Sequence, residues 1–197
     1  MAITEEETRL AQPDAPENIQ LEAWYMDDSA EDQRLPHKLR PCSAEALTEL
    51  GILAWRMNPD AYPNDPKLLA VRKARGYNYE DIVDISPGTL AGYEDKIKAF
   101  YEEHIHTDEE IRCVLEGSGF FDIRDKEDRW IRMWTKKGDL VALPEGIYHR
   151  FTLDENNYIK ALRLFSGVPI WTPLNRPQEE HPSRVKYANQ FMSASTA

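Results

Sequence analysis

Three histidines and one glutamate stand at a spacing that could hold a metal ion. His104 and His106 alternate along a predicted strand, so both side chains point to the same face. Glu110 follows a short turn and begins an apolar run that predicts a second strand, and His149 follows a later Pro-x-Gly turn. Imidazole nitrogens and a carboxylate oxygen suit Fe, Ni, Mn or Zn. We therefore predict that these four residues bind a divalent metal, the alternative being surface histidines beside an acidic loop.

The segment that carries these residues, about 102–170, predicts a β-rich core. At least six short apolar runs alternate there with tight turns, and a turn is expected at 117–119. The runs 120–124 and 130–134 flank a charged loop, which predicts a hairpin. Such a series indicates a small antiparallel sandwich or barrel.

The preceding segment, about 43–101, predicts a cover of helices packed on one side of this core. Ser43 is a favourable N-cap, and Asp65 followed by Pro66 repeats that pattern, with Gly76 at the expected helix end. A third helix is expected from Tyr93, because apolar residues recur there at helical spacing.

The chain of 197 residues is long enough for one domain with extensions. Residues 1–20 are acidic and contain two prolines, so we predict a disordered tail. The polar residues 181–197 predict a second loose tail, which leaves a single domain over 21–180.

Charge and composition exclude several classes of partner. A formal net charge of -11 argues against nucleic-acid binding, which requires clustered Lys and Arg. No apolar run approaches the ~20 residues that cross a bilayer, and the acidic N-terminus is no secretory signal. Cys42 and Cys113 cannot form a disulfide framework, which favours the cytoplasm, with access to the nucleus. No long heptad pattern demands a dimer, so we expect a monomer.

The two ligand clusters resemble the paired motifs of the cupin superfamily. The resemblance includes Glu110 and Gly117 with six residues between them, and Pro144 and Gly146 before the last histidine, but Lys98 stands where a glycine is usual and Leu153 where an asparagine is usual. It implies a β-rich α+β fold: a cupin-type double-stranded β-barrel, or jelly roll, with a few helices packed on its outside.

A closer resemblance, to the eukaryotic acireductone dioxygenases, spans about Leu21 to Pro177. It is carried by five blocks in the family's order and spacing: Ala23–Asp28, Phe100–His106, Gly117–Asp125, Tyr148–Phe151 and Asn175–Pro177. The family acts in methionine salvage on an acireductone, 1,2-dihydroxy-5-(methylthio)pent-1-en-3-one. With Fe(II) the implied products are 4-methylthio-2-oxobutanoate and formate, and with Ni(II) they are 3-methylthiopropanoate, formate and carbon monoxide. The resemblance thus implies one Fe(II) or Ni(II) per chain, with acireductone and O2 as the small-molecule partners.

Arg112 follows Glu110 by two residues, so it shares the face that points to the metal. Its charge could hold a substrate oxyanion, the role assigned to the family's matching arginine, and the alternative is a surface ion pair. Phe100 and Phe151 match family positions described as aromatic walls near the substrate, although core packing is an equally simple interpretation.

Other polar residues carry simpler interpretations. His37 lies in a Pro-containing loop and His181 precedes a proline, so both are expected to be exposed to solvent. Glu103 could support a metal ligand from behind, but it is interpreted as an exposed carboxylate, and Arg176 receives no role.

Two other functions stay open at this point. The first is another metal-dependent cupin enzyme, such as an isomerase that uses the same ligands without consuming oxygen. The second is a non-catalytic metal-binding or interaction module, which a missing ligand would favour, but all four predicted ligands are present. Oxygen uptake separates the dioxygenase from the isomerase.

Overall fold

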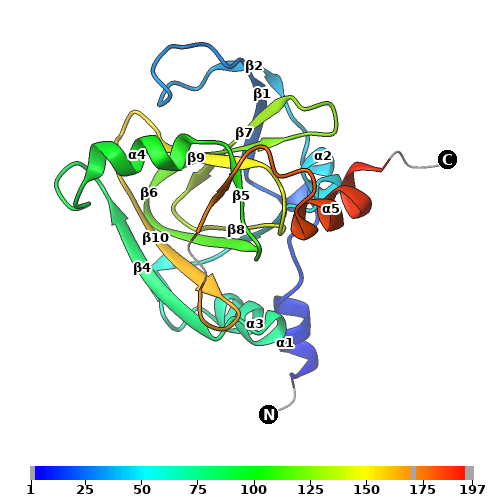
Figure 1. Ribbon diagram of the computed structural model, residues 1–197. Coiled ribbons are helices and arrows are strands. Elements are labelled where there is room, and N and C mark those ends of the chain that lie inside the picture. The colour runs from blue at the N-terminus through cyan, green and yellow to red at the C-terminus, as the bar shows by residue number, and fades with distance from the viewer. Residues whose placement is uncertain (1–2, 170–171, 194–197) are drawn as a thin grey trace.

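One long strand, β6 (Glu110–Arg124), belongs to two antiparallel sheets in the computed structural model, which describes residues 3–169 and 172–193 (Figure 1). The first half of β6 pairs with β8 (Asp139–Leu143) and β10 (Ile159–Phe165). Its second half pairs with β7 (Trp130–Lys136) and β9 (His149–Leu153). The shared strand therefore fixes the two sheets relative to each other.

The remaining strands extend these two sheets at their edges. In the first sheet, β8 pairs with β3 (Leu53–Arg56) and β10 pairs with β4 (Tyr79–Ile85). The second sheet continues from β7 to β1 (Glu22–Met26) and β2 (Lys38–Pro41). On its other side it continues from β9 to β5 (His104–Ile105) and β11 (Leu174–Asn175).

Apolar side chains of the two sheets meet between them. Ile123 and Met133 come from the second sheet, Val141 and Leu143 come from the first, and all four are fully buried. Burial of each such side chain stabilises the fold by roughly 1.5–3 kcal/mol. The alternation of apolar residues along the strands therefore produces the core.

Helices lie on the outside of the strands (Figure 1). The predicted caps are confirmed, because Ser43 and Asp65 each accept a backbone hydrogen bond at the start of a helix. No helix among the described residues is long and apolar enough to span a bilayer. The helical segments are α1 (Glu5–Leu10), α2 (Ala44–Glu49), α3 (Pro66–Arg75), α4 (Tyr93–Tyr101), α5 (Pro182–Tyr187), short 3₁₀ turns at Pro16–Asn18 and Pro59–Ala61, and a π-helical turn at Ala188–Met192.

The predicted β-rich α+β class, with helices outside, is confirmed, as is the hairpin between β6 and β7. The helical cover over 43–101 is only partly right, because β3 and β4 lie within it and extend the first sheet. Strand β4 contains three acidic residues, so its extended conformation depends on pairing with β10 rather than on a local apolar pattern.

The turn predicted at 117–119 is wrong. Gly117 has a φ of +71° but lies inside β6, where it pairs with Ile159 of β10. The pairing with β10 shifts register just before it, at Leu115, which has no partner in β10. The backbone carbonyl of Tyr158 occupies the space that a Cβ on Gly117 would need. Only a glycine therefore fits here, at the point where β6 passes from its pairing with β10 to its pairing with β7.

Neither predicted tail is loose within the described residues. The indole of Trp55 donates a hydrogen bond at 3.0 Å to the carbonyl of Ala11, the C-cap residue of helix α1. The buried Tyr187 hydroxyl, at the end of α5, donates to the Leu50 carbonyl at 3.0 Å. Short polar helices of this kind are stabilised by docking, which local composition does not reveal. Residues 1–2 and 194–197 of the predicted tails lie outside the described part.

Candidate metal centre

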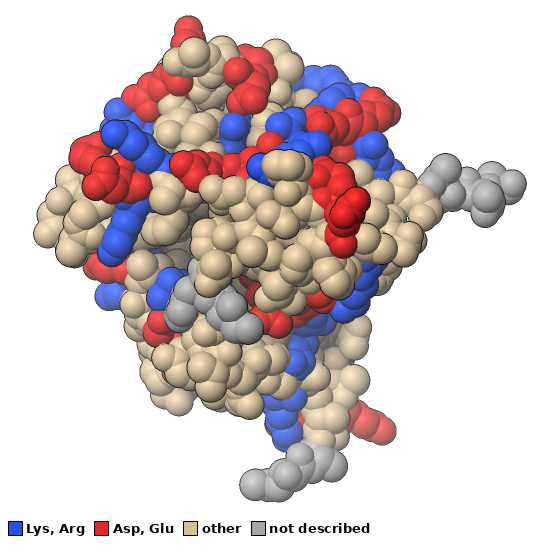
Figure 2. Space-filling view, in the orientation of Figure 1, with Lys and Arg blue, Asp and Glu red and all other residues tan. Residues whose placement is uncertain are grey.

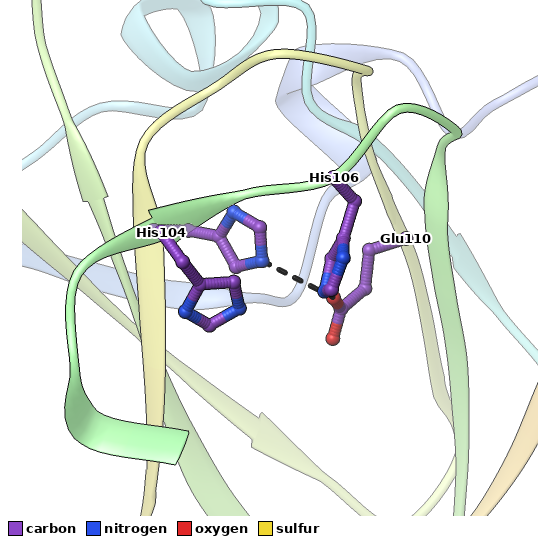
Figure 3. A group of neighbouring side chains, drawn as sticks. His104, His106 and Glu110 are labelled. Atoms are coloured by element: carbon purple, nitrogen blue, oxygen red, sulfur yellow. Dashed lines mark hydrogen bonds and ion pairs between the residues drawn. The ribbon is translucent and has the colours of Figure 1, made fainter. Parts of the chain in front are cut away.

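Four side chains gather where strands β5, β9 and β6 approach one another. Pairing of β5 with β9 sets His104 opposite His149, His106 follows β5, and Glu110 is the first residue of β6. One potential ligand atom from each residue lies within 4.8 Å of the others. Figure 3 shows the labelled side chains of His104, His106 and Glu110 turned toward one shared space. Residues far apart in the sequence thus form a single cluster.

Backbone carbonyls fix the orientation of two of the imidazole rings. Nδ1 of His104 donates to the Glu102 carbonyl at 2.7 Å, and Nδ1 of His149 donates to the Ile147 carbonyl at 2.9 Å. Since a carbonyl can only accept, the proton of each neutral ring lies on Nδ1 and the lone pair lies on Nε2. Both rings therefore hold the form that a metal ligand requires.

The distances between the donor atoms also fit a metal ion. Nε2 of His149 and Nε2 of His106 each lie 3.1 Å from Oε2 of Glu110. A cation between the Glu110 oxygen and these two imidazole nitrogens would be bound by all three atoms. Ligand atoms that are each ~2.1 Å from one ion, at right angles, lie about 3 Å apart. The residues present therefore fit a divalent metal.

Charge within the cluster favours the ligand forms of these groups. Burial lowers the pKa of His104 to about 3, helped by the nearby His149, so the ring is neutral at pH 7. Burial alone would raise the pKa of Glu110, but the Arg112 guanidinium and the neighbouring imidazoles hold it well below its usual value. Nη2 of Arg112 lies 3.1 Å from Oε1 of Glu110, so the carboxylate is ionised beside a fixed positive charge.

A cavity of about 340 Å³ opens beside the cluster. Phe100 and Phe151 stand edge to face in its wall, with ring centroids 6.4 Å apart. This volume suits a small organic molecule. The structure brings all seven predicted site residues to the cavity: Phe100, His104, His106, Glu110, Arg112, His149 and Phe151.

The sequence profile of the ARD/ARD' family matches residues 22–173, which is most of the chain. The chain belongs to this family. It is 64% identical to acireductone dioxygenase 1 of Physcomitrium patens over 175 residues, which cover 87% of this chain and 90% of that protein. It is 61% identical to acireductone dioxygenase 4 of Arabidopsis thaliana over 170 residues, which cover 85% of this chain and 91% of that protein.

A solved structure of this family is also similar. It is an acireductone dioxygenase from Bacillus anthracis with a cadmium ion in its active centre, and it is 29% identical with a TM-score of 0.57. The superposition covers 66% of this chain and 86% of that one. The predicted family, the cupin-type β-barrel and the assignment as a dioxygenase are therefore confirmed, and the donor cluster supports a metal cofactor.

Part of the cavity wall of this ARD/ARD' family member was not predicted from the sequence. Its apolar wall includes Val83 and Ile85 from β4 and Ile159 and Ala161 from β10. Arg163 lies on the same face of β10 and forms an ion pair with Asp81 of β4 at 2.7 Å. Arg163 interrupts the apolar residues at alternate positions of β10. This interruption in the sequence could have indicated that Arg163 lies at the cavity.

The solvent-exposed interpretations fail for His37 and Glu103. His37 is 8% exposed, with Nε2 2.9 Å from the Asp32 carbonyl. The Glu103 side chain is 18% exposed and binds Arg124 and Arg176, which also gives Arg176 a contact that the sequence did not assign. Ion pairs between distant segments decided the burial of Glu103, and such pairs leave no local pattern.

His181 is half-buried and lies away from the cluster. Its Nδ1 accepts a hydrogen bond from the Ser183 backbone at 3.2 Å and caps α5. The prediction that His181 is exposed to solvent is therefore only partly right. Among the described residues, His181 does not belong to the metal-donor set.

Proposed function

We propose that this dioxygenase cleaves an acireductone, 1,2-dihydroxy-5-(methylthio)pent-1-en-3-one, with O2 as a step of methionine salvage. The observation that carries the proposal is the donor set itself, three imidazoles and one carboxylate at the end of an apolar cavity. High identity to two plant acireductone dioxygenases supports the choice of substrate.

His104, His106, Glu110 and His149 would hold one Fe(II) or Ni(II) per chain. The bound ion would supply a Lewis acid and template for the enediol oxygens of the substrate. In this proposal the products would be 4-methylthio-2-oxobutanoate and formate with Fe(II) bound, and 3-methylthiopropanoate, formate and carbon monoxide with Ni(II) bound.

Arg112 would stabilise the ionised enediol. Its guanidinium lines the cavity and is held 3.1 Å from the Glu110 carboxylate, so its charge is already oriented before substrate enters. Burial lowers the pKa of Arg112, but a guanidinium keeps its proton in proteins and remains a fixed cation. A cation aimed at a developing oxyanion in a site with little water is the arrangement that favours such a reaction.

The aromatic and aliphatic walls would orient the rest of the substrate and exclude water. Phe100 and Phe151 stand at the cavity wall, and Phe151 also packs on Phe121 with ring centroids 5.0 Å apart. Apolar residues of β4 and β10, such as Val83 and Ile159, form a surface that suits a methylthio chain.

The proposal is tested by anaerobic reconstitution of the metal-stripped protein with Fe(II) or with Ni(II). Each form is then given acireductone and O2, and ketoacid, formate and carbon monoxide are quantified. Ketoacid from the Fe(II) form supports the dioxygenase, and carbon monoxide from the Ni(II) form supports control of the products by the metal. An absence of oxygen consumption with both metals would contradict the proposal and favour the isomerase.

The remaining assignments rest on composition. We propose a monomer without nucleic-acid or membrane partners, located in the cytoplasm with access to the nucleus. On the face shown in Figure 2, Lys and Arg side chains are interspersed with Asp and Glu. The free Cys42 and Cys113 are compatible with a reducing compartment. Size-exclusion chromatography with light scattering tests the monomer.

A further inference from the structure

Each histidine on the paired strands β5 and β9 has a charged neighbour that points away from the cluster. Glu103 precedes His104, and Arg150 follows His149. Side chains alternate along extended backbone, so these neighbours lie behind the metal centre, on the outer face of the second sheet. Neither residue lines the cavity.

Two other residues connect these neighbours across the outer face. Arg124 donates from Nε and Nη2 to the Glu103 carboxylate, at 2.9 and 3.0 Å. The Cζ atom of Arg124 lies 3.7 Å from the centroid of the Trp130 ring, and that of Arg150 lies 4.1 Å from the same centroid. Both guanidinium groups therefore contact the indole of Trp130. Glu103, Arg124, Trp130 and Arg150 thus form a continuous contact chain, here named the rear brace.

The far end of the rear brace is firmly anchored. Nε of Arg150 donates to the Asp122 carboxylate at 2.9 Å, and Asp122 also accepts from Nε of Arg132 at 2.7 Å. Asp122 and Arg132 are both fully buried. Charge-assisted hydrogen bonds in such surroundings are strong and directional, so Arg150 has little freedom to move.

Strand β5 needs support of this kind. It contains two residues and pairs with β9 through His104 and His149 alone. Its partner on the other side, β11, is equally short. Backbone pairing therefore does little to hold His104 at ligand distance, and side-chain contacts have to contribute.

We propose that the rear brace positions His104 relative to His149 and thereby sets how slowly the metal leaves the site. This inference rests on the metal centre assigned under the proposed function. Residues of the brace do not touch the metal or the substrate, so they act as positioning residues. Groups that orient metal ligands from behind typically change metal affinity by about 10–100-fold when they are removed.

The test compares Arg124→Met with Arg129→Met in the full chain loaded with Ni(II). Methionine keeps an apolar stem beside the ring but removes the ion pair. Arg129 is a matched control in the same hairpin, because it also binds a carboxylate, that of Asp125, at 2.7 Å, and lies over an aromatic ring, that of Tyr25. Release of Ni(II) to an excess of a coloured chelator is followed by absorbance, and the melting temperature of each metal-free variant is measured alongside.

We expect Arg124→Met to release Ni(II) about tenfold faster than the wild type, and Arg129→Met to stay within about twofold of it. Both metal-free variants should melt at similar temperatures, which a purely structural role for Arg124 would not produce. Equal release rates from the wild type and Arg124→Met would overturn the brace. A wild-type protein that binds no Ni(II) would instead overturn the metal centre of the proposed function.

A second variant keeps the test decisive if Arg124→Met does not fold. Glu103→Gln removes one carboxylate of the brace and leaves the Glu103 backbone carbonyl, which accepts from Arg176 at 3.0 Å, in place. Glu103→Gln also weakens the ion pair with Arg176, so we expect it to accelerate release of Ni(II) at least as much as Arg124→Met does. The double variant should be no faster than Glu103→Gln alone, since that change already breaks the link to Arg124. Additive effects on the release rate would contradict a shared path.

Discussion

The backbone N–H of Gly146 donates a hydrogen bond to the backbone carbonyl of His106 at 3.1 Å. This bond joins the turn that precedes His149 to the loop that carries His106, and both histidines are proposed ligands. Gly146 has a φ of +78°, and the backbone of Ser183 fills the space that its Cβ would need. The glycine is thus required both by its conformation and by the closely packed α5.

Replacing this glycine should damage both the fold and the metal centre. We expect Gly146→Ala to destabilise the protein by about 2–4 kcal/mol, from backbone strain and steric overlap together, and to weaken binding of Ni(II). Gly76→Ala is the control, since Gly76 has a φ of +70° but no atom lies within 4 Å of the position its Cβ would take. This substitution should destabilise the protein by about 1 kcal/mol. Urea unfolding measures both, and equal losses in the two variants would contradict a role for packing against Ser183.

Removal of the carboxylate should empty the metal centre. Glu110→Ala takes away one of four donors and leaves Arg112 without its partner at 3.1 Å, so Ni(II) affinity should fall at least ~100-fold and activity should fall with it. Equilibrium dialysis followed by metal analysis measures the affinity. His181→Ala, outside the cluster, should bind metal as the wild type does, and full metal occupancy in Glu110→Ala would remove Glu110 from the ligand set.

Arg112 should matter for turnover rather than for metal content. We expect Arg112→Ala to keep one metal per chain at pH 7 and to lose about 10²–10³-fold in kcat/KM, the usual effect of removing a group that stabilises an oxyanion. Arg72→Ala is a suitable control, because Arg72 pairs with Glu80 outside the cavity. Oxygen-electrode kinetics give kcat/KM of both variants, and metal analysis gives their metal content. Unchanged kinetics in Arg112→Ala would exclude the proposed role.

The N-terminal segment should stabilise the barrel without affecting the metal. A variant lacking residues 1–14 leaves the buried Trp55 indole without its acceptor at Ala11 and exposes apolar surface on α3, so the free energy of unfolding should fall by about 2–4 kcal/mol. A variant lacking only residues 1–3 keeps the Thr4 cap and should match the full chain. Denaturant titration of both proteins checks this, and equal stability of all three would restore the prediction of a loose tail.

Several features were determined by the sequence alone because short-range rules control them. Alternation along extended backbone puts His104 and His106 on one face, and a polar cap followed by a residue that suits the first turn begins a helix at Ser43 and at Asp65. A charged loop between two apolar runs produces the hairpin of β6 and β7. Each rule acts between residues that are close in the chain, so each can be read without knowledge of the fold.

Tertiary structure decided what depends on distant partners. Strand β4 is a strand because β10 pairs with it, Gly117 has no room for a side chain because Tyr158 lies against it, and Glu103 is partly buried because Arg124 and Arg176 bind it. None of these partners is a neighbour in the sequence, and the free energy of each contact comes from groups that only folding brings together. The sequence therefore determined which residues could form the metal centre, while the fold decided what supports them from behind.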